Sequence, residues 1–220
     1  MQEILPLLGR CALFEGIAPA ELSGLLDCLR ARMSSYRRNQ VIFSEGDAAA
    51  EVGIVLSGAA QIVQEDFYGN RSILAHIGPG ELFGESYACA GIPSLPVSIV
   101  AAEDCRIMLI DCQHITTSCS NACGFHNQMI HNLLRVVANK NLLFHQKIEI
   151  TSRRSTREKL MAYLLHQAKL HGSSEFTIPY DRQALADYLG VERSAMSAEI
   201  SKLRRDGVIE CDKSRFRLLQ

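Results

Sequence analysis

The sequence has no apolar run that approaches the ~20 residues needed to cross a lipid bilayer. Its N-terminus also lacks the basic region and apolar core of a secretory signal. We therefore expect a cytoplasmic protein with no membrane partner. The eight cysteines of such a chain are expected to be reduced thiols rather than a disulfide framework.

The sequence also lacks the residue combinations that catalysis requires. It has no paired carboxylates, no nucleophile beside a base and no phosphate-binding loop at a productive spacing. Gly78 and Gly80 mark a turn rather than a dinucleotide fingerprint, because a strand is expected after them. We expect no enzymatic activity and no required cofactor.

Length and charge indicate two small domains of different character. The chain has 220 residues, 47% of them hydrophobic, and a net charge of −1. From Glu149 onward there are 13 Lys and Arg against 10 Asp and Glu, whereas residues 1–148 have 10 against 14. The basic excess therefore lies in the C-terminal part, although an excess of this size often reflects only a solvated face.

Residues 181–209 have the pattern of two short helices joined by a tight turn at Gly190. In the second helix, Met196, Ile200 and Leu203 form an apolar stripe. The opposite face carries small and hydroxylic side chains and one arginine, which suits entry into the major groove of DNA. The residues predicted to face DNA are Arg193, Ser194, Ser197 and Ala198.

The segments on either side complete the motif. After Gly207, apolar and polar residues alternate around residues 212–214, which predicts a two-stranded wing. Before it, residues 156–168 form an amphipathic helical pattern. Together these elements predict a winged helix-turn-helix that binds double-stranded DNA. Further DNA-binding residues are expected to be Arg182, Lys202, Arg205, Lys213 and Arg215, the last three at phosphates.

The N-terminal part has a different sequence pattern. Residues 1–32 predict short helices, with Pro19 suited to a first helical turn, and short β-type runs separated by turn residues extend from Ser34 to Asp111. No helical segment separates these runs, which disfavours a parallel sheet. The predicted fold class is α+β, with an antiparallel β-roll of the double-stranded jelly-roll type, a long dimerisation helix and a C-terminal winged helix-turn-helix. The expected domains are residues 1–111, 112–150 and 151–220.

A long helix is predicted from Asn121 or Ala122 to Glu149, and six of its residues follow the alternating four-three spacing of a coiled coil. We predict that they form the seam of a parallel homodimer, in which Asn141 pairs with its twin and fixes the register. The alternative is a buried single helix whose asparagine faces solvent. The seam residues are Ile130, Leu134, Val137, Asn141, Phe144 and Ile148. A second stripe, Met129, Leu133, Val136 and Leu143, is expected to pack on the barrel of the same subunit.

Three motifs carry a family resemblance: Glu45-Gly46-Asp47, the segment GPGELFGE at residues 78–85, and the helix-turn-helix from Leu189 to Ile209. With the long helix between them, they closely resemble the Crp/Fnr family of bacterial transcription regulators over essentially the whole chain. The resemblance implies an allosteric effector in the roll that reorients two recognition helices on a palindromic operator. It also implies that promoter binding brings or excludes RNA polymerase.

The chain departs from the family where cyclic-nucleotide-binding members hold the ligand. Those members have an Arg followed by Ser or Thr some ten residues beyond the positions of Gly84 and Glu85, and here Leu95 and Pro96 stand there. Since burying an unpaired phosphate costs several kcal/mol or more, we predict that cyclic AMP is not the effector. An unknown, uncharged or hydrophobic small molecule is expected in an apolar pocket, unless these side chains simply fill the roll. The pocket candidates are Phe83, Gly84, Glu85, Ser86, Tyr87, Leu95, Pro96 and Val97.

The recognition helix departs from the family as well. The best-known members present a Glu and, four residues later, an Arg that both contact bases, and the matching positions here are Ser194 and Ala198. We therefore expect a different operator half-site, with Arg193, Ser194 and Ser197 as base-contacting residues.

Cysteines and histidines offer a weaker alternative. Cys119, Cys123 and His126 share one helical face that could ligate zinc, haem or a cluster. The spacing lacks a tight C-x2-C pair, and the iron–sulfur members place their cysteines mainly before the roll, where this chain has only Cys11 and Cys28. We therefore predict no metal. Two alternative functions stay open. The chain could sense redox conditions through a pair of cysteines, or it could be a cyclic-nucleotide-type ligand-binding module that regulates a protein partner.

Overall fold

The computed structural model describes residues 4–117 and 125–219. It divides into two compact units, one made of Met1–Glu65 and Leu74–Asn141 and the other of Asp66–Ile73 and Leu142–Gln220. Among the helices that are described, none combines the length and hydropathy that a bilayer crossing requires.

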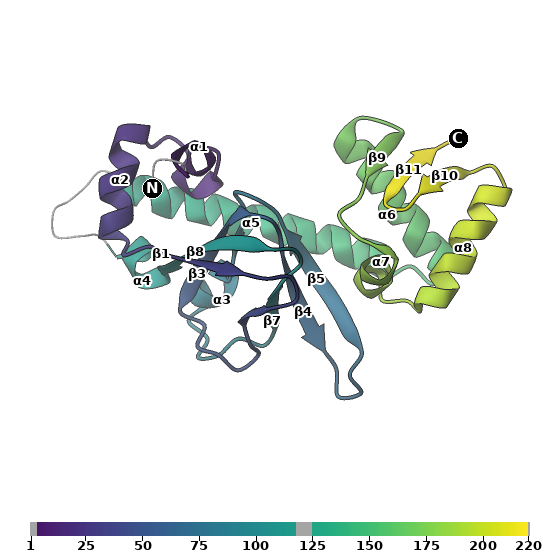
Figure 1. The fold of residues 1–220 in the computed structure, drawn as a ribbon, viewed down its shortest axis with the longest axis horizontal. Helices are drawn as coiled ribbons and strands as arrows, with labels where there is room; N and C mark the ends of the chain where they lie inside the picture. Colours follow the sequence, from purple (N-terminus) through teal and green to yellow (C-terminus); the bar gives the residue numbers. More distant parts are fainter. Residues whose placement is uncertain (1–3, 118–124, 220) are drawn as a thin grey trace. The chain divides into compact units, whose positions relative to one another are not determined.

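The first unit is built on two four-stranded antiparallel sheets (Figure 1). One sheet has the order β1 (Arg32–Tyr36), β8 (Cys105–Asp111), β3 (Glu51–Ser57) and β6 (Leu82–Phe83). The other has the order β2 (Val41–Phe43), β7 (Ser98–Ala101), β4 (Ala60–Glu65) and β5 (Arg71–Ile77). The predicted roll of antiparallel strands is confirmed, as two sheets rather than a closed barrel.

Strand β3 buries both of its faces, which explains its nearly continuous apolar sequence. Successive side chains of a strand point to opposite faces of the sheet. Ile54 therefore joins a core cluster with the N-terminal helices, whereas its neighbour Val55 joins a second cluster that draws on both sheets. Met108 and Ile107 on strand β8 divide in the same way. This sheet is the middle layer of the unit.

Short helices flank the roll. The N-terminal ones are α1 (Leu5–Leu8), a 3-10 turn η1 (Ala12–Phe14) and α2 (Pro19–Cys28), and Pro19 begins α2 as predicted. Helix α3 (Glu85–Ala90) was not expected from the sequence and lies between two left-handed glycines, Gly84 and Gly91. Helix α4 (Cys112–Thr116) begins where Asp111 accepts a hydrogen bond from the backbone of Gln113.

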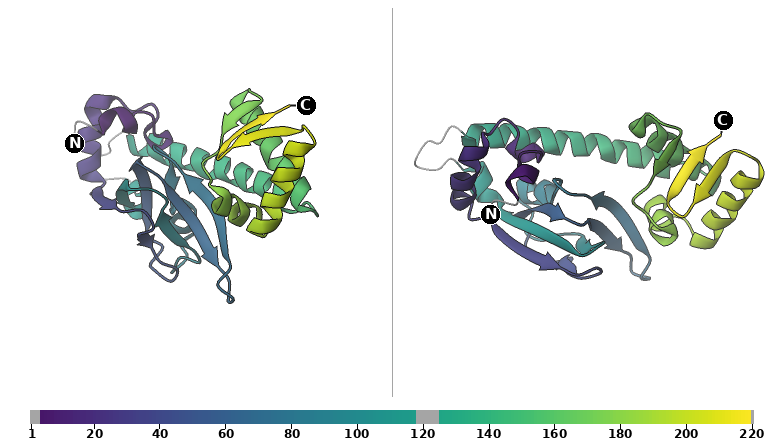
Figure 2. Two further views of the ribbon diagram at one scale, coloured as in Figure 1. Left: turned by 45° about the vertical axis from the view of Figure 1, so that its right-hand side comes forward. Right: turned by 45° about the horizontal axis from the view of Figure 1, so that its top comes forward.

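The long helix α5 (Phe125–Thr151) has 27 residues (Figure 2). The predicted start at Asn121 or Ala122 lies outside the described residues. Of the second stripe, Met129, Leu133 and Val136 are buried against the roll, as predicted, in a core cluster that also includes residues of the N-terminal helices. The prediction is wrong for Leu143, whose side chain is 57% exposed. Since Leu143 falls beyond Asn141, where the first unit ends, that unit offers it no core to join.

The second unit contains the predicted winged helix-turn-helix. Its elements are α6 (Thr156–His171), β9 (Glu175–Thr177), α7 (Arg182–Leu189), α8 (Arg193–Arg205), β10 (Ile209–Asp212) and β11 (Arg215–Leu218). Helix α6 begins with a capping box between Ser155 and Glu158. Strand β9 was not expected, and it extends the wing to a sheet of order β10-β11-β9. Ile209 and Phe216 anchor this sheet in the core.

Candidate nucleic-acid interface and effector cassette

The turn between α7 and α8 is held from both sides. Asp181 accepts a hydrogen bond from the backbone of Ala184 at 2.9 Å, which caps the start of α7. At the other end, Gly190 adopts a φ of 61°, a left-handed conformation that glycine adopts without steric cost. The Nζ of Lys159 on α6 lies 3.4 Å from the carbonyl oxygens of both Leu189 and Gly190. The sequence analysis missed this contact, because it joins residues about 30 positions apart.

Helix α8 exposes the face predicted to contact DNA. Met196, Ile200 and Leu203 are almost fully buried and fix the helix on the domain. Over its first two turns the opposite face carries one long side chain, Arg193, and otherwise small ones: Arg193, Ser194 and Ala198 are exposed and Ser197 is half-buried. The structure therefore brings the four predicted residues together on one accessible ridge.

An ion-pair cluster fixes the C-terminal end of α8. Nη1 of Arg157 on α6 lies 3.4 Å from Oδ2 of Asp206 and 4.0 Å from Oε2 of Glu199. Arg157 was also missed by the sequence analysis. Its partners stand far along the chain and on a different helix, so no local pattern marks it.

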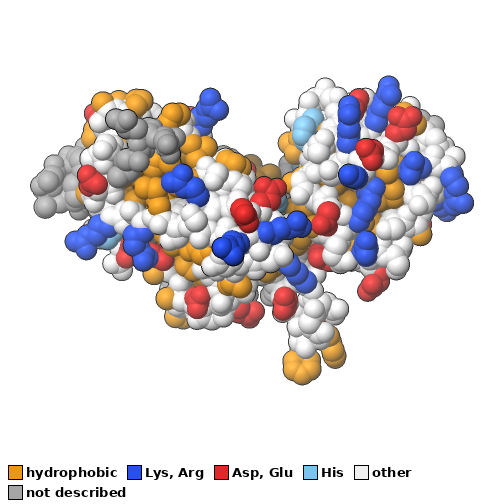
Figure 3. Space-filling view, in the orientation of Figure 1, with side chains coloured by type: hydrophobic (Ala, Val, Ile, Leu, Met, Phe, Trp, Pro, Cys, Tyr) orange, Lys and Arg blue, Asp and Glu red, His pale blue; other side chains and the backbone are white. Residues whose placement is uncertain are grey.

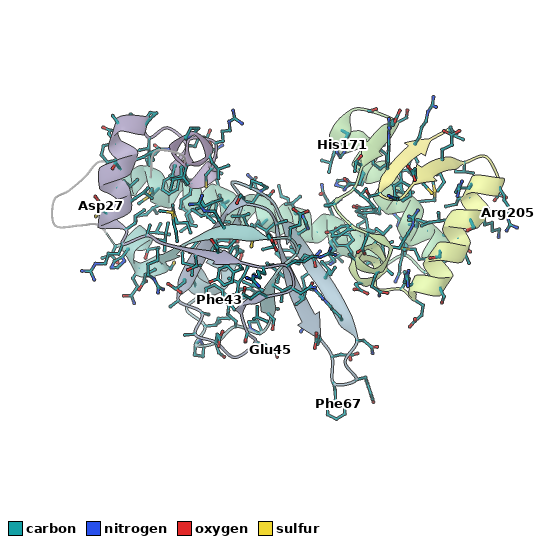
Figure 4. The ribbon with its side chains drawn as sticks, in the orientation of Figure 1. Asp27, Phe43, Glu45, Phe67, His171 and Arg205 are labelled. Carbon is teal, nitrogen blue, oxygen red and sulfur yellow. The ribbon has the colours of Figure 1, made fainter. Side chains whose placement is uncertain are left out.

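The other predicted DNA-binding residues differ in how freely their side chains are placed. Lys202, Arg205 and Lys213 are exposed, and Arg205 points into solvent at the end of α8 (Figure 4). Arg215 is exposed and forms an ion pair with Glu175 of β9. Arg182 is half-buried: its guanidinium donates to Sγ of Cys211 at 3.3 Å and lies 5.2 Å from the ring centroid of Phe216. Several Lys and Arg side chains, with acidic side chains among them, lie on the visible face of this unit (Figure 3).

The segment GPGELFGE at residues 78–85, here called the effector cassette, contains a glycine that no other residue could replace without strain. Gly84 has a φ of 81°, and a Cβ there would lie 2.7 Å from the carbonyl oxygen of Glu51. This conformation lets α3 begin directly after β6, with Glu85 as its first residue.

Glu85 is buried and satisfied by groups of its own chain. Its side chain is 2% exposed, and Nζ of Lys140 on α5 lies 2.9 Å from Oε1 and 3.0 Å from Oε2. The hydroxyl of Ser86 donates to Oε1 at 3.0 Å. Lys140 also donates to the carbonyl of Leu82. The sequence analysis missed Lys140, which is separated from Glu85 by 55 residues.

The apolar pocket candidates lie in two places. Phe83 and Val97 belong to the packed core between the sheets, and Tyr87 packs against it. The ring of Phe83 meets Phe43 with centroids 6.2 Å apart. Leu95 is buried in a loop whose backbone exchanges hydrogen bonds with Gly46 and Asp47, whereas Pro96 is exposed. A hollow of about 370 Å³ lies elsewhere on the roll and is lined by Ser35, Tyr36, Arg37, Gln40, Ser57, Asp104, Cys105 and Arg106.

The predicted seam forms an apolar row on α5. Its exposed members include Leu134, Phe144 and Ile148, with exposed fractions of 64%, 40% and 62%. Asn141 is exposed within the same row, and Ile130 and Val137 are half-buried.

The predicted metal-ligating trio is only partly described. Cys119 and Cys123 lie outside the described residues. His126 is 2% exposed, and its Nε2 lies 3.3 Å from the carbonyl oxygen of His114. Over residues 4–117 and 125–219, no three His, Cys, Asp or Glu side chains gather as metal ligands would.

Comparison with known proteins places both units. The cyclic nucleotide-binding domain family matches residues 33–121, and the Crp-like helix-turn-helix domain family matches residues 158–220. The cyclic AMP receptor protein of Thermus thermophilus is 27% identical over 198 residues, which cover 90% of this chain and 87% of that protein. The nitrogen fixation regulation protein FixK of Azorhizobium caulinodans is 27% identical over 199 residues, which cover 84% and 74%.

Solved structures share the fold. FixK2 from Bradyrhizobium japonicum has a TM-score of 0.69 at 23% identity, covering 86% of this chain and 93% of that one. The c-di-GMP responsive global regulator CLP of Xanthomonas campestris has a TM-score of 0.73 at 17% identity, covering 90% and 99%. The two family matches, the curated relatives and the recognition helix of the second unit agree, and the chain belongs to the Crp/Fnr family of DNA-binding transcription regulators.

Proposed function

We propose that the chain acts as a homodimer that binds a palindromic operator through two copies of α8. Control comes from a small-molecule effector in the β-roll that is not cyclic AMP. The observation that carries the proposal is the division of α8 into a buried face and an exposed face of small and hydroxylic residues. Such a ridge enters the major groove without steric obstruction.

Base recognition is assigned to the first turns of α8. Arg193 stands at the first position of the helix, where its side chain reaches guanine edges, and Ser194 and Ser197 follow on the same ridge. Lys202, Arg205, Lys213 and Arg215 contact phosphates beside the ridge, which positions the domain without selecting a sequence. Arg182 contributes less, because its guanidinium already packs on Phe216.

Dimerisation is assigned to the apolar row on α5. Leu134, Phe144 and Ile148 are large hydrophobic side chains that expose 40% or more of their surface in a single chain. A coiled-coil seam would remove that surface from water, and Asn141 would pair across the two-fold axis and fix the register. A two-fold dimer matches the symmetry of a palindromic operator.

The effector is proposed to be uncharged or hydrophobic. Leu95 and Pro96 stand where cyclic-nucleotide-binding members have an arginine and a hydroxyl, so a cyclic phosphate would lack a counter-charge. The buried carboxylate of the cassette, Glu85, is occupied by Lys140. The effector-bound dimer on a promoter then recruits or excludes RNA polymerase.

Binding to the chain's own upstream promoter DNA, measured at several salt concentrations, tests this function. We expect a sequence-selective complex whose affinity falls steeply as salt rises, because phosphate contacts release counterions. A protein that instead docks on a protein partner would give no such complex. For the effector, candidate ligands are added and unfolding is followed. A ligand at a hundredfold its Kd adds about 2.7 kcal/mol, and cyclic AMP is expected to add nothing.

A further inference from the structure

Two thiols near the effector cassette are in contact. Sγ of Cys89, in the last turn of α3, lies 3.7 Å from Sγ of Cys112, the first residue of α4. The two residues are 23 positions apart in the chain. Neither the proposed operator binding nor the proposed effector binding makes use of them.

The surroundings of the two thiols differ. Cys112 is 6% exposed, and its backbone N–H donates to the carbonyl of Ala50 at 2.9 Å, so its position is fixed by the end of strand β8. Cys89 is exposed, near the end of a six-residue helix. A disulfide bond is about 2.05 Å long. The sulfurs therefore have to approach by less than 2 Å, which a rotation of the more accessible Cys89 side chain and a small shift of α3 can supply.

We propose that Cys89 and Cys112 are a redox modification site, which forms a reversible intramolecular disulfide in the presence of a low-molecular-weight disulfide such as oxidised glutathione. The exposed Cys89 thiolate attacks one glutathione sulfur, which forms a mixed disulfide and releases one glutathione thiolate. Cys112 then loses its proton to solvent, and its sulfur attacks Cys89 Sγ and releases the second glutathione thiolate. Two protein thiols are oxidised, and one glutathione disulfide is reduced to two glutathione molecules.

The pKa values of the two thiols set the rate of this exchange. Burial raises the pKa of the Cys89 thiol and raises the pKa of Cys112 to about 12. Because the thiolate is the attacking species, the exchange is slow at neutral pH and accelerates with rising pH. The same high pKa makes Cys112 a poor leaving group when a reductant attacks, so the disulfide, once formed, is also lost slowly.

The bond would restrain the helix that carries Glu85. Cys89 lies four residues after Glu85 on α3, and Cys112 is anchored at the end of β8. Oxidation therefore fixes the end of α3 opposite to the Glu85–Lys140 ion pair. The site acts on the effector cassette and does not depend on DNA binding, so its failure leaves the proposed operator binding untouched.

The experiment incubates the reduced full-length protein with oxidised glutathione at pH 7.0 and pH 8.5, followed by mass spectrometry and peptide mapping. We expect a mass about 2 Da below that of the reduced chain, a peptide pair that links Cys89 to Cys112, and recovery of the reduced mass with excess dithiol. The reaction should be faster at pH 8.5, by about tenfold per pH unit while the thiols are mostly protonated.

Three variants separate the outcomes. Cys112→Ser should stop at a stable glutathione adduct on Cys89, Cys89→Ser should leave the Cys112 peptide unmodified at the early time points, and Cys211→Ser should form the Cys89–Cys112 disulfide as the wild type does. Linkage of Cys89 to any other cysteine would overturn the proposal. So would a persistent glutathione adduct on Cys89 of the wild-type protein, or an intramolecular disulfide at Cys112 that forms equally fast without Cys89. Because Cys89 is exposed, Cys89→Ser keeps the test decisive even where Cys112→Ser fails to fold.

Discussion

The ammonium group of Lys140 lies 2.9 Å from Oε1 of Glu85, so helix α5 contributes a largely buried counter-ion to the first residue of α3. The two side chains expose only 19% and 2% of their surface. The Glu85 carboxylate therefore ties α3 to α5, the helix that carries the predicted seam.

Removing the lysine should be costly. In Lys140→Met, the Glu85 carboxylate stays buried without its counter-ion, and loss of one partner of a buried pair costs about 3–5 kcal/mol. Urea denaturation measures the change. The matched control is Arg135→Met on the same helix, since Arg135 pairs with Glu15 at 3.0 Å but both side chains are more than half exposed. That change should cost about 0–1 kcal/mol. Equal costs for the two variants would show that the Glu85 pair is not a strong restraint.

A second prediction concerns the close approach of Phe83 to strand β3. A Cβ at Gly53 would lie 2.0 Å from Cζ of Phe83, so Gly53→Ala must displace a fully buried ring. We expect a loss of at least about 1–3 kcal/mol, as for overpacked cores. The control is Gly24→Ala in helix α2, where a Cβ meets nothing within 4 Å. That substitution should raise stability by about 0.5–1 kcal/mol, because alanine restricts the unfolded chain and favours helix. A neutral Gly53→Ala in thermal and chemical unfolding would contradict the packing described.

The winged helix-turn-helix could be predicted from the sequence because its signals are local. Gly190 supplies a left-handed turn, and Met196, Ile200 and Leu203 repeat at the spacing of one helical face. The strands of the roll were also recognisable, since turn residues separate short β-type runs. In each case the residues that decide the structure lie within about ten positions of one another, which is the range over which periodicity is informative.

Features that depend on distant partners could not be predicted. Strand β9 has three residues and exists because β11 pairs with it, and α3 is six residues long, too short for a helical period to show. Lys140 and Lys159 are ordinary lysines in the sequence, and only the fold brings them to Glu85 and Gly190. The exposure of Leu143 has the same origin, because the helical pattern continues beyond the core that it was expected to join.

DNA recognition gives a third prediction. Arg193→Ala should lower operator affinity by about 1–3 kcal/mol and relax the preference at one base pair, since the side chain is assigned to a base edge. Lys169→Ala, an exposed residue near the end of α6, is the control and should change neither. Titration of operator variants, each altered at one position, measures both quantities. If Arg193→Ala loses the same affinity for every operator variant, Arg193 contacts a phosphate rather than a base.

Stability should depend on pH through Lys147. Burial lowers the pKa of Lys147 to about 8 from an ordinary value of 10.5, and its Nζ lies 4.2 Å from the ring centroid of Tyr188. At pH values between about 8 and 10.5, Lys147 is still protonated in the unfolded chain but has lost its proton in the folded chain. Stability therefore rises as the pH increases above about 8, and is lost as the pH falls through that value.

The Lys147→Met variant isolates this effect. Above pH 9, buried thiols and tyrosines contribute in the opposite direction, because burial raises the pKa of Cys112 and Tyr188. The informative quantity is accordingly the difference in unfolding free energy between wild type and Lys147→Met from pH 7 to pH 9. We expect the variant to be the more stable at pH 7 and the advantage to shrink toward pH 9. If the difference in unfolding free energy does not change with pH, Lys147 does not titrate between pH 7 and pH 9.

The apolar row on α5 supplies a matched pair of leucines for the dimer. Leu134 belongs to the predicted seam and is 64% exposed, whereas Leu142 lies off the seam on the same helix and is 60% exposed. Because both side chains are equally accessible in one chain, a charge at either should have a similar effect on folding of the monomer. Only Leu134→Glu would bury two like charges across a two-fold seam, which is strongly unfavourable. Sedimentation velocity should find Leu134→Glu monomeric and Leu142→Glu dimeric, and operator affinity should fall only in the first. Dimers of equal strength in both variants would move the interface away from this row.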